Sequence, residues 1–284
     1  LKSTPVVTTI STFSGQLDGP KGMRFLYDAG NWYGFFVADN WNAANQNVLV
    51  RLDFGNSLLN NPTINNFGNL GGVIGEYLTD LDIAKTSLGF IGFISTTSGK
   101  VFRINFGASI TSTPTATNLG VLGGAKATYS FNLFQRNGNW YLFMPKDDFS
   151  PPSNSYLVNL GFGTSLLNTP TVTNYGNPGN LLNRAYDFLP FVDCESLKGY
   201  VLAPGANKIV EYTFPQDINS TTLIGRDIGN VANFVFPPDF SNVLIYNNEK
   251  YVFVTNQSSN TISRLKLSSN CNSFGVPSSI LTNP

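Results

Sequence analysis

The chain has 284 residues, of which 42% are hydrophobic and 12% charged, and its 17 Lys and Arg balance its 17 Asp and Glu. Since no basic excess exists to neutralise phosphates, nucleic acid is not an expected partner. Histidine is absent, which excludes a Ser-His-Asp triad and removes the usual general base and zinc ligand. No apolar run is long enough to predict a membrane-spanning helix.

One stretch of the chain occurs twice. Residues 31–72 begin with Asn31-Trp32-Tyr33 and return as residues 139–180, with a shorter version between them. A Phe-Gly pair or its equivalent recurs at spacings of 52, 56, 52 and 53 residues, at Phe54-Gly55, Phe106-Gly107, Phe162-Gly163, Phe214-Pro215 and Leu267-Ser268. The chain is therefore expected to consist of five repeats.

Each repeat predicts four short strands separated by turn residues, with little helix. In chain order the first repeat predicts strands at 23–28, 32–37, 48–54 and 63–67, and the second at 76–83, 90–95, 101–106 and 115–119. The third predicts strands at 128–134, 140–144, 156–162 and 171–175, and the fourth at 185–192, 199–203, 209–214 and 221–225. The fifth predicts strands at 241–246, 251–255 and 261–267, with a weak last strand at 279–281.

The apolar patterns of these strands favour a ring of blades. The second strands are nearly continuous apolar runs, such as Tyr33 to Val37, so both of their faces must be covered. The third strands alternate, as in Val48 to Phe54, and are expected nearer an edge. We predict an all-β propeller of five four-stranded blades, forming one domain over residues 1–284. A solenoid is the main competitor, but its coils usually run to roughly 20 to 30 residues. Six blades remain an alternative if a further segment precedes the chain.

The first residues predict how the ring closes. Ser3 to Thr8 matches the fourth-strand sequence Asn61 to Asn65, so residues 1–12 are expected to pair as the outer strand of the last blade. Closure of this kind hides strand edges that would otherwise promote aggregation. Because the chain opens in the middle of a repeat, we expect it to be part of a longer protein.

The last repeat carries Tyr251-Val252-Phe253-Val254-Thr255-Asn256, which resembles the Tyr-Val-Thr-Asn blade motif of bacterial cell-surface propellers. The Phe-Gly-Asn-Ser-Leu-Leu-Asn-x-Pro-Thr run and the closing residues 277–284 resemble the propeller segments of large surface proteins of gliding bacteria, exported by the type IX system. The resemblance implies an extracellular, cell-surface protein of adhesion or gliding motility, with other domains of the same long chain as partners.

Catalysis is the alternative to this interpretation, because five-bladed propellers include glycoside hydrolases. Such enzymes generally need two carboxyl groups, which inner strands supply to the central channel. The first strands, or the residues just after them, offer six acids: Asp28, Asp80, Asp82, Asp187, Asp193 and Glu195. The first strands of the third and fifth repeats offer none. The competing interpretation is that these acids cap turns or face solvent, and fold alone assigns no function.

Two loops carry the predicted ligand-binding residues. Asp39 precedes Trp41 by two residues, and Asp147 and Asp148 precede Phe149 at the equivalent place. A loop aromatic can stack on a sugar or peptide, and the carboxylates could bind hydroxyls or a Ca²⁺ ion, although no cofactor is expected. Alternatively, the aromatics fold back on their blades and the acids cap the turns.

The functional prediction is a non-catalytic recognition or display module that binds protein or glycan at a surface, and not an enzyme. The alternative is a carbohydrate-active propeller, either a lectin or a glycoside hydrolase. Cys194 and Cys271 fall in neighbouring repeats of the ring, where they either form one disulfide or remain separate thiols.

Overall fold

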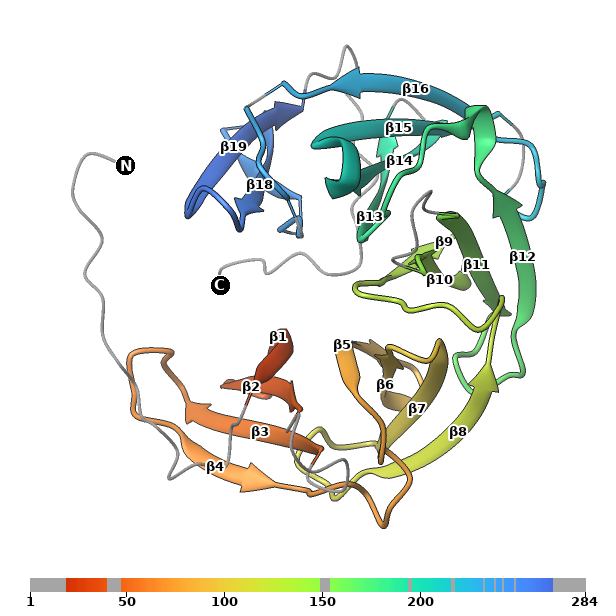
Figure 1. Ribbon diagram of the computed structural model, residues 1–284. Helices are drawn as coiled ribbons and strands as arrows, with labels where there is room; N and C mark the ends of the chain where they lie inside the picture. The colour runs from red at the N-terminus through yellow and green to blue at the C-terminus, as the bar shows by residue number, and fades with distance from the viewer. Residues whose placement is uncertain are drawn as a thin grey trace.

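The chain folds into a ring of five antiparallel sheets (Figure 1). The computed structural model describes residues 19–267, apart from 40–46, 149–153, 194–195, 216–217, 232, 238, 242 and 248. The predicted outer strand at residues 1–12 and the weak strand at 279–281 lie outside this part. Each of the five sheets corresponds to one repeat of the sequence, and the predicted five-bladed propeller is confirmed.

The strands follow one another in chain order. Blade 1 contains β1 (Pro20–Asp28), β2 (Asn31–Ala38), β3 (Val48–Gly55) and β4 (Thr63–Asn66), and blade 2 contains β5 (Leu78–Thr86), β6 (Gly89–Thr96), β7 (Lys100–Gly107) and β8 (Thr115–Val121). Blade 3 contains β9 (Asn132–Arg136), β10 (Asn139–Lys146), β11 (Tyr156–Gly163) and β12 (Thr171–Gly176). Blade 4 contains β13 (Asp187–Asp193), β14 (Ser196–Ala203), β15 (Lys208–Phe214) and β16 (Ile224–Gly229). Blade 5 contains β17 (Leu244–Tyr246), β18 (Glu249–Asn256) and β19 (Thr261–Leu267).

Each blade places its first strand nearest the centre of the ring and its last strand outermost (Figure 1). Blades 1 to 4 have four strands, and blade 5 has three over the described residues. The helical content of the described chain is limited to short 3-10 turns such as η3 (Pro178–Asn180) and η4 (Pro204–Ala206). The described part of the chain has no helix able to cross a membrane.

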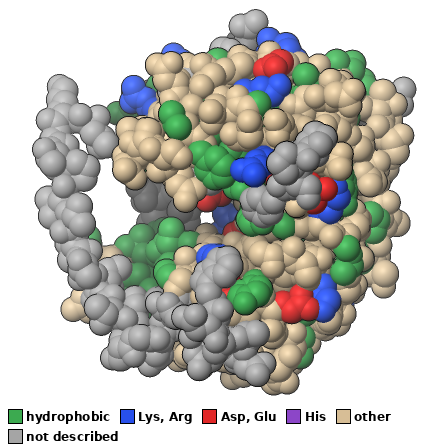
Figure 2. All heavy atoms as spheres, in the orientation of Figure 1, with side chains coloured by type: hydrophobic (Ala, Val, Ile, Leu, Met, Phe, Trp, Pro, Cys, Tyr) green, Lys and Arg blue, Asp and Glu red, His purple; other side chains and the backbone are tan. Residues whose placement is uncertain are grey.

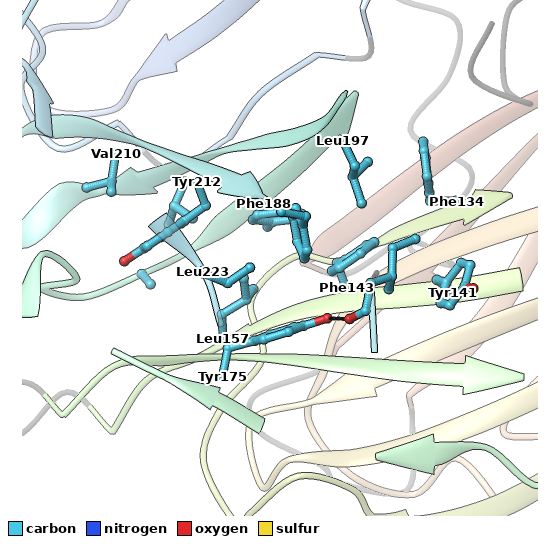
Figure 3. Packing of buried hydrophobic residues seen from close by; sticks show 14 of the residues in the cluster. Phe134, Tyr141, Phe143, Leu157, Tyr175, Phe188, Leu197, Val210, Tyr212 and Leu223 are labelled. Carbon is cyan, nitrogen blue, oxygen red and sulfur yellow. Dashed lines mark hydrogen bonds between the residues drawn. The ribbon is translucent and has the colours of Figure 1, made fainter. Parts of the chain in front are cut away.

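The core lies between the blades. One apolar cluster joins blades 1 and 2, another joins blades 2 and 3, and the largest joins blades 3 and 4 (Figure 3). The Phe-Gly pairs contribute as their sequence predicts: each phenylalanine is buried, and the following glycine has the positive φ that turns the chain. These glycines are Gly55, Gly107 and Gly163, with φ of 68°, 70° and 66°.

Several predicted elements differ from the structure. The first strands of blades 3 and 5 begin at Asn132 and Leu244, later than the predicted residues 128 and 241. The third strands are more buried than their alternation suggests, because each is covered by a neighbouring blade as well as by its own sheet. The last strand of blade 4 begins at Ile224, later than the predicted residue 221. The Ser220 hydroxyl accepts a hydrogen bond from the Thr222 amide at 3.3 Å, which holds this segment as a turn before the strand starts.

Candidate functional site

Four residues occupy equivalent positions at the start of the inner edge of blades 2 to 5. The pairing of first with second strands places Asp80 and Asp187 at the same level of their blades. An isolated bridge at Phe240 places Asp239 at this level in blade 5. By the same register, blades 2 to 5 place Asp80, Ser130, Asp187 and Asp239 at this level, whereas β1 of blade 1 has a bulge here, with Gly22 between the paired residues Lys21 and Met23. Carboxyls from blades 2, 4 and 5 therefore converge at one end of the ring, where Figure 2 shows charged side chains around the central hollow.

Blade 1 contributes backbone at this level because its residue is glycine. A Cβ on Gly22 would lie 2.4 Å from the backbone nitrogen of Leu81 and 2.6 Å from the Cα of Asp80. No side chain fits at that distance. The close approach brings β1 against the strand that carries Asp80, and so fixes one side of the acid cluster.

Blade 3 supplies the hydrogen-bond donors that hold the carboxyls. The Ser130 hydroxyl and the Phe131 amide donate to Oδ2 of Asp80 at 3.1 and 3.0 Å. The side-chain amide of Asn132 donates to Oδ1 of Asp187 at 3.1 Å. Ser130 is also within hydrogen-bonding reach of Asp187. Since a hydroxyl carries a single proton, it can donate to one of the two carboxyls at a time.

Loss of water raises the pKa of all three carboxyls. Burial is the main cause for Asp80, whose pKa lies well above its usual value, and the charge of Asp239 raises it further. Burial also raises the pKa of Asp187, against the opposing hydrogen bonds from the Phe240 amide and Ser130. For Asp239, burial of the carboxyl and then the charge of Asp187 raise the pKa to about 7. The cluster therefore retains a proton near neutral pH.

The three carboxyls differ in accessibility. Asp187 is buried, whereas Asp80 is half-buried and Asp239 keeps an exposed surface, although burial is the main cause of the raised pKa of its carboxyl. Asp80 and Asp239 are therefore the acids open to a ligand, and Asp187 lies behind them.

An ion pair lies one layer deeper in the channel. The Arg24 guanidinium contacts Asp82, with 2.7 Å between Nε and Oδ1, and both side chains are largely buried. The Leu133 amide donates to the other carboxyl oxygen at 2.9 Å. Burial raises the pKa of Asp82, and the charge of Arg24 opposes that rise. The charge of Arg24 also lowers the pKa of Asp80 and Asp187, but by less than burial raises it. Arg24 therefore limits the rise in pKa of these carboxyls.

The predicted ligand-binding acids have partners within the fold. Asp39 and Asp147 follow the ends of β2 and β10, at the same end of the ring as the acid cluster. Both are fully buried: Asp39 pairs with Lys21 at 3.0 Å, and Asp147 accepts a hydrogen bond from a neighbouring serine. Asp148 pairs with Lys126 at 2.6 Å. Their contacts are those of structural residues, while Trp41 and Phe149 lie outside the described residues.

The remaining candidates lie away from the cluster or cannot be placed. Asp28 pairs with Lys85 at 2.5 Å, and Asp193 pairs with Lys198 at 3.1 Å, at the far ends of their strands. Glu195, Cys194 and Cys271 fall outside the described residues. Within the described ranges, no group of three or more acidic or cysteine side chains is arranged to hold a metal ion. Calcium binding therefore stays a prediction.

Sequence reasoning missed one member of the site. Asp239 precedes the predicted fifth-repeat strand, so that strand was expected to carry no acid. Backbone pairing at Phe240 nevertheless extends the inner edge of blade 5 back to Asp239. A usable signal existed: an acid followed by an apolar residue occurs at the start of three blades, as Asp80-Leu81, Asp187-Phe188 and Asp239-Phe240.

The fold and the channel acids define a five-bladed propeller with a carboxyl cluster in its channel, and solved structures of this fold are known. The chain is similar to the catalytic domain of a GH62 α-L-arabinofuranosidase from Coprinopsis cinerea, with a TM-score of 0.56 and 11% identity over 86% of each chain. An α-L-arabinofuranosidase from Lactobacillus brevis gives a TM-score of 0.56 at 10% identity over 95% of each chain. A thermostable family-43 glycoside hydrolase gives 0.56 at 11% identity, over 94% of this chain and 96% of that chain.

No family model matches the sequence. No curated protein matches it either. At these identities the structural likeness establishes a shared fold and assigns no substrate.

The comparisons correct the functional prediction. The prediction of a non-catalytic display module, and of a protein that is not an enzyme, is wrong. The similar propellers are glycoside hydrolases, and the structural match covers 86% to 96% of their chains. The inner-strand acids do not all lie apart as turn caps, which is what that prediction requires. The ring instead brings Asp80, Asp187 and Asp239 together, and the carbohydrate-active alternative is the better supported one.

Proposed function

We propose that this protein is a glycoside hydrolase whose substrate binds at the end of the channel that carries Asp80, Asp187 and Asp239. The observation that carries the proposal is the convergence of three position-equivalent carboxyls with raised pKa values, two of them accessible. Hydrolysis of a glycosidic bond requires two carboxyls, one that donates a proton to the leaving oxygen and one that acts as base or nucleophile. The similar fold of known glycoside hydrolases supports the same reading.

Asp239 fits the role of the proton donor. Its pKa of about 7 keeps a large fraction of the carboxyl protonated near neutral pH, and its exposed surface lets it reach a ligand. A general acid works best when its pKa lies near the working pH. Asp187 acts through Asp239, because its negative charge favours the protonated form of the neighbouring acid.

Asp80 fits the role of the second carboxyl. A proton on Asp239 removes the charge that adds to the rise in the pKa of Asp80, so Asp80 ionises more readily in that state, while burial, the larger cause, still holds its pKa above the usual value. The hydrogen bonds from Ser130 and Phe131 then fix the orientation of its carboxylate. Asn132 and Arg24 complete the polar lining without donating or accepting the reacting proton.

The test is hydrolysis of a panel of aryl glycosides and neutral polysaccharides by the purified chain. We expect release of sugar, and a loss of about 10²-fold or more in kcat for Asp239→Asn and Asp80→Asn. Asp28→Asn is the matched control, since Asp28 lies at the other end of its first strand and pairs with Lys85. A single cooperative melting transition for each variant excludes misfolding.

Leaving-group chemistry separates the two roles. A dinitrophenyl glycoside needs no proton donor, so Asp239→Asn should retain activity on it and lose activity on an alkyl glycoside. Asp80→Asn should lose both. Failure of every substrate to react, or equal losses for Asp28→Asn, would contradict the proposal, and specific glycan binding without turnover would identify a lectin.

The cellular context stays a prediction. Action on a glycan is compatible with the extracellular surface location that the sequence resemblance implies. Export of the native protein into the medium or onto the cell surface, followed with an antibody, would test it.

A further inference from the structure

One position on the third strands carries a charged side chain in four repeats and asparagine in the third. It lies three residues before the Phe-Gly phenylalanine or its equivalent, and the charged residues are Arg51, Arg103, Glu211 and Arg264. Blade 3 has Asn159 there, and it is also the one repeat with a glycine, Gly161, two residues further on. Side chains two residues apart share one face of a strand. Blade 3 therefore has the smallest pair of side chains at this place.

In blades 1 and 2 the larger side chains reach across to the next blade. Arg51 pairs with Asp53, with 2.5 Å between Nε and Oδ1, and its Nη1 donates to the Ile110 carbonyl of blade 2 at 3.0 Å. Arg103 of blade 2 donates in the same way to the Leu167 carbonyl of blade 3 at 2.7 Å. Both arginines therefore fill the space between their own sheet and the turn after the third strand of the next blade.

The equivalent side chains of blade 3 leave that space open. Asn159 is fully buried, and neither polar atom of its side chain has a hydrogen-bond partner within the described chain. Gly161 does not have a positive φ, so its backbone conformation does not require glycine. The three atoms nearest to a Cβ on Gly161 would belong to the side chains of Thr171, Asn219 and Tyr141, at 3.0, 3.6 and 3.9 Å. The interface between blades 3 and 4 therefore keeps both room and unused hydrogen-bonding capacity.

A polar pocket of about 330 Å³ lies beside Gly161, at the end of the ring away from the acid cluster. The turn between β9 and β10 forms one wall, and the turn after β15 of blade 4 forms another. The Tyr175 hydroxyl donates to the Ile218 carbonyl and so fixes the second wall against blade 3 (Figure 3). The lining includes Arg136, Asn137, Asn139, Tyr141, Ile218 and Asn219.

This pocket is separate from the acid cluster. Ser130, which contacts the acids, precedes Arg136 by six residues along the inner edge of blade 3. Six residues of extended chain span about 20 Å. A sugar unit bound in the pocket therefore does not reach the carboxyls.

The lining has the chemistry of a site for a neutral saccharide. In the part of the chain that the structure describes, neither Asn137 nor Asn139 uses its side-chain amide in a hydrogen bond within the protein. The equivalent Asn31 of blade 1 instead donates to the carbonyl of Ala29 at 3.2 Å. An amide offers both donors and an acceptor, which match the hydroxyls of a sugar. The volume is at the lower end of the range of about 300–1,000 Å³ for small-molecule sites, which suits one or two sugar units.

We propose that this pocket between blades 3 and 4 is a second saccharide-binding site, which holds one or two neutral sugar units and takes no part in bond cleavage. The amides of Asn137 and Asn139 bind the sugar hydroxyls. The choice of a saccharide as ligand rests on the proposed function, whereas the pocket itself rests on the replacement of a charged pair by Asn159 and Gly161. The site anchors a glycan to the face of the ring opposite to the acid cluster.

NMR of the ¹⁵N-labelled chain tests this site, with Asp239→Asn as the background so that sugars bind without turnover. The probes are xylotriose, cellotriose and maltotriose at millimolar concentrations. At least one of them should shift the amide signals of residues 136–139 and 218–219, including the side-chain amides of Asn137 and Asn139. Asn139→Ala should weaken this binding about tenfold, the usual effect of losing a hydrogen bond. Asn31→Ala is the matched control and should leave it unchanged.

Gly161→Asp is a second variant, which keeps every amide of the lining and occupies the space beside it. The sheet accepts this side chain, because Asp53 of blade 1 pairs with Thr63 as Gly161 pairs with Thr171. The substitution should abolish the sugar-dependent shifts at 136–139 and 218–219. A single cooperative melting transition checks that the variant folds.

Shifts confined to the acid cluster, or no shifts with any of the three trisaccharides, would overturn the proposal. Shifts caused by inorganic phosphate and by no sugar would also overturn it, because they would identify an anion site at Arg136. Sugar release by the wild type is measured separately, so the two proposals are told apart. Binding in the pocket without turnover supports the second site and contradicts only the hydrolase.

Discussion

The Ser130 hydroxyl lies between two carboxyls of different blades, bonded to Asp80 at 3.1 Å and within reach of Asp187. Blade 3 thus contributes a proton donor at the position where blades 2, 4 and 5 contribute acids. With one proton to share, the hydroxyl favours a state in which one of the two carboxyls is ionised and the other is not. This relationship makes the protonation of the cluster depend on a residue that is itself not titratable.

Ser130→Ala should raise the pKa of Asp187 further, since it removes a hydrogen bond that lowers that pKa. The fold should lose about 1 kcal/mol, the usual net worth of one hydrogen bond. Carboxyl ¹³C titration by NMR measures the shift directly. Ser130→Thr keeps the hydroxyl and should restore the wild-type titration, whereas an identical titration for Ser130→Ala would show that the hydroxyl is not shared.

Asp239 should make the fold less stable as pH rises. Its folded-state pKa of about 7 lies above the ordinary value of 3.8, so the folded state binds the proton more tightly than the unfolded chain does. The resulting stabilisation is complete below about pH 4 and is lost as pH rises through about 7. Melting temperatures of the wild type should therefore fall relative to Asp239→Asn across this range.

Asp227 supplies the control for that experiment. Its hydrogen bond with Lys208 lowers its pKa, so its contribution is present at neutral pH and is lost as the solution becomes acidic. The difference curve of Asp227→Asn should accordingly have the opposite slope. A flat difference curve for Asp239→Asn would mean that the carboxyl is not perturbed.

The buried pair of Arg24 and Asp82 should be costly to break and cheaper to replace as a whole. Asp82→Asn removes the ion-pair partner of the Arg24 guanidinium, and breaking a buried ion pair typically costs about 3–5 kcal/mol. Removing both charges in Arg24→Met with Asp82→Leu should cost less than the sum of the single substitutions. Urea unfolding of the four chains measures the coupling, and strict additivity would show that the two charges do not interact.

The sequence was sufficient for the fold because repetition marks every blade. The strand at Thr261–Leu267 begins and ends where the sequence predicts, and the phenylalanines of the three Phe-Gly pairs are buried. The last strand of blade 4 starts later than predicted because the Ser220 hydroxyl accepts a hydrogen bond from the Thr222 amide. The pattern of apolar and turn residues does not predict such a bond.

The candidate site was harder to predict because it combines residues that are far apart in the chain. Asp80, Asp187 and Asp239 become neighbours through ring geometry, and their raised pKa values arise from burial that one sequence does not state. The predicted ligand-binding role of Asp39 and Asp147 stays a prediction. Their place beside loop aromatics suggested binding, while the structure gives them buried partners.

Gly89 should be the glycine of the inner hairpins that tolerates substitution least. A Cβ there would lie 1.9 Å from the carbonyl oxygen of Gly107, and its φ is +109°, so Gly89→Ala must displace backbone. Gly30 is the control: its φ is +84°, but nothing lies within 4 Å of its Cβ position. Gly30→Ala should therefore cost about 1–2 kcal/mol, the price of a left-handed conformation alone. Gly89→Ala should cost clearly more in chemical denaturation, because the β6–β7 pairing must shift to relieve the clash. Equal losses for the two substitutions would show that backbone conformation, and not the close approach of the strands, decides both.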